Sequence, residues 1–298
     1  MTIGVGNTIL AADYNGIQSA VATILGTGTG DKGYGQPLAS SQVAVAANVA
    51  ASHLINLKAD IESISIHQTN AVYSPALATI SSGGVIYASD WTAYSNAITA
   101  LTGTRFNASS AQMSLGDAVS PSISNWNGNI VHIVTISFPS ADAGRYYFNA
   151  GGEIRFSPSI SSYGAGKGTA WYNLTNSFSP MRFKYKSTTA SAGSASNVGW
   201  YDLTNTYQTI FSITGGATYS QNDIQVEAKC NVASNSAGTA TQMTWQITYR
   251  DDQIENVDEN VNGTLNSKIQ TYRPQAATPP TGATVTLSAP TVTTTSGP

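Results

Sequence analysis

Apolar residues recur at alternating spacings of four and three in three stretches of the first 110 residues, a pattern typical of helices with one buried face. The first stretch consists of Leu10, Tyr14, Ile17, Val21 and Ile24. We expect Thr8 to cap this helix and Gly26 to end it. The third stretch begins at Ser89 or Asp90 and stops at Gly103. Its apolar face consists of Trp91, Tyr94, Ile98 and Leu101.

The second stretch carries the longest apolar repeat, and it predicts a helix from about Ser41 to Gln68 with Ser40 as its N-cap. We call its seven apolar residues the heptad seam: Val43, Ala47, Ala50, Leu54, Leu57, Ile61 and Ile64. Such a seam can pack inside a small helical bundle of one chain, or it can join copies in a homo-oligomer. Both interpretations stay open, because the small residues Ala47 and Ala50 suit close helix contacts of either kind.

From about Asn125 the apolar period changes to two, which indicates β-strands with one face on a core. Ile224 to Val232 and Met243 to Tyr249 alternate most regularly, and residues 233–240 would join them as a hairpin. Further candidate strands are Ile130 to Phe138, Arg182 to Lys186 and Tyr207 to Ile213. The pattern therefore predicts an α+β protein, with N-terminal helices followed by a larger antiparallel β-sandwich.

We expect three regions. Residues 1–110 form a helical assembly or anchoring region, residues 111–274 form the β-sandwich, and residues 275–298 form a Pro/Thr-rich linker with a C-terminal strand or arm around Val285 and Leu287. Within the β region, Arg145 to Ser157 places two aromatic runs around Asn149-Ala150-Gly151-Gly152. Because glycine and asparagine suit tight turns, this segment predicts a β-hairpin of the framework.

Composition narrows the function classes. Charged residues are only 10% of the 298 residues, against about 25% in average globular chains. The net charge of −3 gives no basic footprint for nucleic acid. No apolar run is long enough to span a membrane, and the N-terminus lacks the features of a signal peptide, so we expect synthesis in a cytoplasm. A single cysteine, Cys230, excludes an internal disulfide and is expected in the core.

No pattern assembles a catalytic, cofactor or metal site. The glycines from Gly28 to Gly33 fit a dinucleotide fingerprint but follow a helix instead of a strand, so we expect a helix-to-helix connection. Asp258 to Gly263 matches the first half of a calcium loop, but Ile269 stands where the anchoring glutamate is expected. The segment from Asp251 to Gly263 is therefore predicted to be a solvated surface turn without a cation. Glu153 and Glu227 could form a glycosidase pair only if the fold brought them together.

The remaining candidates are single side chains. His53, His67 and His132 lie too far apart along their predicted elements to share a metal, so we expect neutral surface or boundary residues. The chain also has 15 tyrosines and five tryptophans, which can either stack on sugars or fill a β-core. For Trp200, Trp245 and Tyr249 we expect the core.

Several segments carry a resemblance to a known family: Arg145 to Ser157, Gly199 to Thr204 with Tyr207 to Ile210, Asn222-Asp223, Val257 to Pro274, Val5 to Thr8 and Gly33 to Gln36. They resemble segments of virion structural proteins of tailed phages, notably phages of cyanobacteria. The resemblance implies a non-enzymatic component of the particle, of the fibre, neck or tail-associated type. Its expected partners are copies of itself and other virion proteins. The alternatives are an adhesin module that binds a host surface glycan and a polysaccharide depolymerase.

Overall fold

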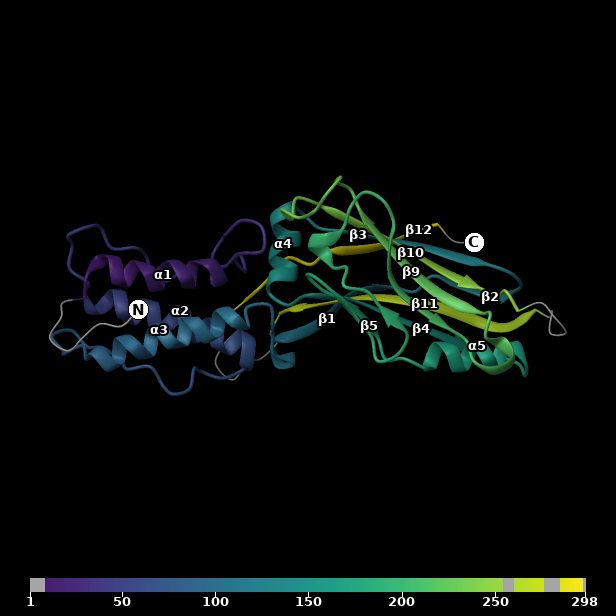
Figure 1. Ribbon diagram of the computed structural model, residues 1–298, viewed down its shortest axis with the longest axis horizontal. Helices are drawn as coiled ribbons and strands as arrows, with labels where there is room; N and C mark the ends of the chain where they lie inside the picture. Colours follow the sequence, from purple (N-terminus) through teal and green to yellow (C-terminus); the bar gives the residue numbers. More distant parts are fainter. Residues whose placement is uncertain (1–8, 254–259, 276–284, 297–298) are drawn as a thin grey trace. The chain divides into compact units, whose positions relative to one another are not determined.

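The computed structural model describes residues 9–253, 260–275 and 285–296 (Figure 1). The chain forms two compact units, each made of segments that are far apart in the sequence. Unit 1 consists of Met1–Ser114, Arg145–Gly151 and Pro274–Leu287. Unit 2 consists of Leu115–Gly144, Gly152–Arg273 and Ser288–Pro298. The predicted boundary near residue 110 falls close to the end of the first segment, but unit 1 also includes two later pieces of chain.

Unit 1 is a bundle of three helices, α1 (Ala11–Leu25), α2 (Ala51–Thr69) and α3 (Ala88–Gly103), each in contact with the other two (Figure 1). Their apolar faces form one core, to which Ala150, Val285 and Leu287 from the later segments contribute. Helices α1 and α3 therefore agree with the predicted ones in extent and in buried face, except that Leu10 is 60% exposed. Asp13 accepts a hydrogen bond from the Leu10 amide at the start of α1, and the predicted cap Thr8 lies outside the described residues.

The second helix begins ten residues later than predicted, so Val43, Ala47 and Ala50 lie outside it. Side chains of α1 and α2 bond the backbone of the segment that precedes α2. The Asn15 amide bonds both the N–H and the C=O of Val43, at 2.8 Å each. The Asp60 carboxylate accepts the N–H groups of residues 39 and 40 at 2.9 and 2.8 Å. These bonds satisfy an extended loop, and the heptad spacing of the sequence does not reveal them.

Unit 2 contains two six-stranded antiparallel sheets (Figure 1). The first has the order β1 (Met113–Val119), β11 (Val261–Pro274), β4 (Glu153–Ser161), β5 (Met181–Phe183) and β6 (Thr188–Thr189), with β2 (Ser122–Trp126) also paired to β11. The second has the order β12 (Thr291–Ser296), β3 (Ile130–Ser137), β10 (Gln242–Arg250), β9 (Asp223–Cys230), β8 (Gln208–Thr214) and β7 (Ser194–Ala195). The α+β class, the large antiparallel β unit and the β9–β10 hairpin were all predicted, and the structure confirms them.

The inner faces of the two sheets pack on each other and form the core of unit 2. Phe183 of one sheet and Trp245 of the other lie edge to face, with ring centroids 5.8 Å apart. His132 Nδ1 lies 2.8 Å from the Ser267 hydroxyl of the opposite sheet. Trp200, Trp245 and Tyr249 are fully buried, so these three aromatics fill the core as expected. This packing is the β-sandwich architecture that the alternating pattern predicts.

The segment from Arg145 to Ser157 is not a hairpin. Its first half belongs to helix α4 (Ala141–Asn149), and only its second half is a strand, β4. The Ser140 hydroxyl accepts the Ala143 N–H at 3.1 Å and caps the helix, and Gly151 at φ +81° follows its end. The Asn-Ala-Gly-Gly sequence is therefore a helix stop. Aromatic residues favour strands locally, but here the burial of Tyr147 and Phe148 on the helix outweighs that preference.

Other elements were not predicted. Helix α5 (Lys167–Asn176) lies beside β4. The short 3-10 helix η1 (Ser110–Gln112) lies between α3 and β1, and two others, η2 (Trp200–Asp202) and η3 (Ala217–Tyr219), connect strands. Val285 and Leu287 do not lie in a strand; an isolated bridge joins Gln275 to Thr286, and the C-terminal edge strand is β12. No helix within the described ranges is long and apolar enough to cross a membrane.

Candidate functional site

The heptad seam does not form a surface. Leu54, Leu57, Ile61 and Ile64 are at most 1% exposed, because α1 and α3 of the same chain cover them. Of the remaining three residues, Val43 is buried in the same core, whereas Ala47 and Ala50 are exposed. The centre of the heptad seam therefore packs inside the helical bundle of one chain, which is the first of the two interpretations. An assembly contact of unit 1 has to use other residues.

Ala47 lies in an apolar groove at the start of α1, which we call the Val45 groove. Its volume is about 470 Å³. It is lined by Ile9, Leu10, Ala11, Ala12, Asn15, Val45, Ala46, Ala47 and Asn48. Val45 is 94% exposed and Leu10 60%, so two branched apolar side chains beside an apolar depression face solvent. None of the described residues that line the groove is charged. Sequence spacing could not reveal it, because it arises where the loop replaces the predicted start of α2.

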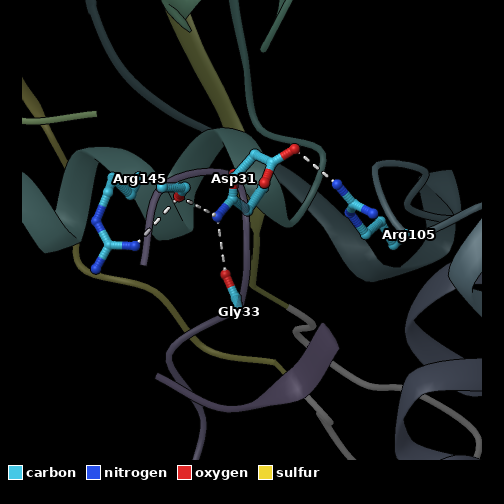
Figure 2. A network of polar contacts seen from close by, with 6 residues as sticks. Asp31, Gly33, Arg105 and Arg145 are labelled. Carbon is cyan, nitrogen blue, oxygen red and sulfur yellow. Dashed lines mark hydrogen bonds and ion pairs between the residues drawn. The ribbon is translucent and has the colours of Figure 1, made fainter. Parts of the chain in front are cut away.

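The glycine-rich loop after α1 is held by side chains of α4 (Figure 2). Arg145 Nη1 donates to the carbonyls of Gly28 and Gly30 at 2.7 and 3.2 Å, and Asn149 Nδ2 donates to the Gly33 carbonyl at 3.1 Å. Asp31 at the loop apex pairs with Arg105 at 2.7 Å (Figure 2). The N–H groups of residues 32, 33 and 35 bond carbonyls of the chain itself. These bonds hold the loop in place at the end of α1, and the N–H groups of residues 32, 33 and 35 are not available to a phosphate.

Unit 2 contains a larger pocket between α5 and the connection from β8 to β9, which we call the α5 pocket. Its volume is about 630 Å³, within the range of small-molecule sites. Helix α5 and its N-cap contribute Gly166, Thr169, Ala170, Trp171, Asn173, Leu174 and the following Ser177. The opposite wall consists of Ile213, Thr214, Gly215, Gly216, Ala217, Tyr219 and Asn222, with Ala192 at the side.

A buried ion pair fixes the floor of the α5 pocket. Lys167 Nζ lies 3.0 Å from Asp251 Oδ2, and the two side chains are 1% and 0% exposed. Asp251 Oδ1 also accepts hydrogen bonds from Asn222 Nδ2 at 3.0 Å and from Trp171 Nε1 at 3.4 Å. Trp171 is further held edge to face by Trp126, at 5.9 Å between centroids. The pocket therefore has a preformed floor, and the charges beneath it neutralise each other.

Asp251 does not lie in a solvated turn as predicted, because it is 3% exposed and serves three donors. Residues 254–259 of that acidic segment lie outside the described residues. Across the described ranges, no group of three or more histidine, cysteine or acidic residues is placed to hold a metal ion. The sequence contains one indication of the buried ion pair, because Lys167 stands on the same helix face as Trp171 and Leu174. A lysine on a buried face requires an anionic partner.

The two candidate carboxylates lie on strands of different sheets and have separate partners. Glu153 on β4 is surrounded by cations, with Arg155 at 2.9 Å and Lys184 at 3.5 Å. Glu227 on β9 accepts a hydrogen bond from Gln246 at 3.4 Å. The structure therefore does not bring Glu153 and Glu227 together as a glycosidase pair.

Two of the three histidines are buried, contrary to the expected surface or boundary positions. His67 and His132 are 0% exposed. His67 Nε2 donates to the Ala150 carbonyl at 3.0 Å, which requires the Nε2–H form of the ring. Burial lowers the pKa of His67 to about 4, although the Ala150 hydrogen bond acts in the opposite direction. Cys230 is buried as predicted, and burial raises the pKa of its thiol.

Comparison of the chain with protein-family models, with curated proteins and with solved structures found no match. The class that the fold defines is an α+β protein with a three-helix unit and a β-sandwich unit.

Proposed function

We propose that this protein is a non-enzymatic structural component of a tailed-phage particle, of the fibre, neck or tail-associated type. Unit 1 joins neighbouring copies, and the β-sandwich of unit 2 is displayed or packed against other particle proteins. The resemblance of several segments to virion structural proteins supports this class. The observation that carries the assembly role is the Val45 groove, where branched apolar side chains lie exposed on a chain with few charges.

The occupant that best fits the Val45 groove is a second copy of the same chain. Two-fold contacts between identical chains bring the same patch of each copy together. Val45 protrudes almost completely into solvent beside an apolar depression on its own chain. In a two-fold pair, Val45 of each copy can enter the groove of the other. Burying these side chains removes apolar surface from water at no cost in charge desolvation.

Val45→Asp tests the assembly role, because it places a charge at the centre of the contact. We expect native mass measurement to give an oligomer for the wild type and a folded monomer for Val45→Asp, and we expect virions to incorporate less of the variant. Val85→Asp is the matched control, because Val85 is 70% exposed in the same unit and lies outside the groove. A wild type that is monomeric both alone and in the particle, or equal effects of the two variants, would contradict the assembly role.

The non-enzymatic part of the proposal has its own test. Purified protein should release no reducing sugar from host envelope polysaccharide. Turnover that disappears in Glu153→Gln would instead establish the depolymerase alternative and refute the structural assignment.

A further inference from the structure

We propose that the α5 pocket of unit 2 binds a neutral saccharide unit. This inference goes beyond a structural role, because it gives the β unit a ligand and a defined site for it. It depends on the walls of the pocket, on their charge and on which polar groups are already engaged. All of these lie within unit 2 and do not depend on the assembly of copies.

The walls combine apolar and polar groups in the way that a sugar requires. A saccharide has C–H faces that pack on aromatic and aliphatic groups, and a rim of hydroxyls that need hydrogen-bond partners. The pocket offers Ile213, Ala217 and the ring of Tyr219 as exposed or half-buried apolar surface, and the buried Trp171 and Leu174 lie in its floor. At 630 Å³ it has the volume of a site for a small ligand of this kind.

Three polar side chains on the walls are available for a ligand. Asn173, Thr214 and Tyr219 have no side-chain hydrogen-bond partner within the part of the chain that the structure describes. An amide and two hydroxyls both donate and accept, which matches sugar hydroxyls. By contrast, Trp171 and Asn222 direct their N–H groups to Asp251 and are fixed in place. The pocket therefore has a rigid floor and uncommitted polar walls.

The charge of the walls selects a neutral ligand. Lys167 and Asp251 lie beneath the floor, and each neutralises the other at 3.0 Å. Among the described residues, no acidic, basic or histidine side chain lines the pocket itself. An ionised ligand would leave water without an opposite charge, which is strongly unfavourable. Uronic and sialic acids and phosphorylated sugars should therefore bind more weakly than neutral hexoses and N-acetylhexosamines.

Gly216 allows the pocket to be closed without disturbing the fold. Its backbone is extended at φ −117°, and a Cβ built there meets no atom within 4 Å. Gly216→Leu therefore adds a branched side chain to the lining of the pocket at little strain. Gly103→Leu is the matched control, because a Cβ there is equally free and the residue lies in unit 1. On α5, Asn173→Ala removes a wall amide, and Asn176→Ala removes an amide of the same helix that does not line the pocket.

The experiment is a ligand-observed NMR screen of the full chain with neutral mono- and disaccharides, their methyl glycosides, glucuronic acid and N-acetylneuraminic acid. We expect a neutral sugar or its methyl glycoside to bind at millimolar concentration, with more than about 10-fold weaker binding to Gly216→Leu. Asn173→Ala should weaken binding by about 3-fold or more, the effect of one hydrogen bond. Gly103→Leu and Asn176→Ala should bind as the wild type does.

Three results would overturn the assignment: no neutral sugar binds, acidic sugars bind as tightly as neutral ones, or Gly216→Leu binds normally. Native mass measurement of the same variants separates this outcome from the assembly role. Gly216→Leu should assemble as the wild type does, and Val45→Asp should still bind the sugar. Failure of one proposal is thus visible without failure of the other.

Discussion

The buried ion pair under the α5 pocket gives the sharpest prediction. Lys167→Met keeps most of the length of the side chain but removes its charge, and it leaves the Asp251 carboxylate without its cation in the interior. Both side chains are at most 1% exposed, so water cannot replace the lost partner. Breaking such a pair from one side costs about 3–5 kcal/mol. A domain is stable by about 5–15 kcal/mol, so unit 2 should lose a large part of its stability.

A double variant tests whether charge is the cause. In Lys167→Met/Asp251→Asn both charges are absent, and the amide oxygen introduced at position 251 still accepts from Trp171 and Asn222. The new amide N–H then faces the Met side chain, at a cost of about 1–3 kcal/mol. We therefore expect the double variant to be more stable than Lys167→Met by about 1–3 kcal/mol, a strong positive coupling.

Urea unfolding followed by tryptophan fluorescence measures these differences, because Trp126, Trp171, Trp200 and Trp245 report on unit 2. The control is Lys184→Met, since Lys184 is 36% exposed at its side chain and its partner Glu153 keeps Arg155. We expect this control to cost less than about 1 kcal/mol. The reasoning is refuted if Lys167→Met costs no more than the control, or if the double variant is no more stable than Lys167→Met.

Three further predictions concern unit 1. As the pH falls, His67 takes up a proton near pH 6.5 in the unfolded chain, but only near its lowered pKa of about 4 in the folded chain. The free energy of unfolding should therefore fall by about 3 kcal/mol across this interval. Urea titrations at several pH values should show that His67→Gln reduces this loss. Gly35→Ala should lower the melting temperature more than Gly83→Ala, because both have φ near +75° but only at Gly35 does the added Cβ collide with a side chain, the ring of Tyr146. Equal losses would show that backbone strain alone decides. Leu57→Asp should unfold the helices, by circular dichroism, and a folded monomer would instead place the seam between copies.

Local sequence patterns were sufficient to predict a helix or strand where its buried face is apolar throughout. Helix α3 and the β9–β10 hairpin follow their predicted ranges closely, because each pairs an uninterrupted apolar face with clear stop residues. Strand β11 shows the opposite case, since Ser267 and Thr271 occupy inward positions and are fully buried. Such polar side chains can lie in the core because hydrogen bonds across the sandwich satisfy them, as between Ser267 and His132. The pattern of one strand cannot reveal a partner on another.

The site residues were harder to predict for the same reason. The heptad seam was recognised as a helix face, but its first part was wrong because Asn15 and Asp60 bond the loop that precedes α2. The α5 pocket was missed because its walls come from segments about 40 residues apart, and neither wall has a motif. Lys167 alone carried information, as a charged residue on an otherwise apolar helix face. Its partner Asp251, 84 residues away, was assigned to a surface turn.

The composition of unit 1 from three separate stretches has a consequence for biosynthesis. Ribosomes release the N-terminal segment first, and N-terminal domains commonly fold while the rest is still being made. Here the bundle core also needs Ala150, Val285 and Leu287, and the last two of these are synthesised only after strand β11. The helices can pair early, but their core is complete only after most of unit 2 has been synthesised. Completion of the helical core is thereby delayed until residue 287 has been synthesised.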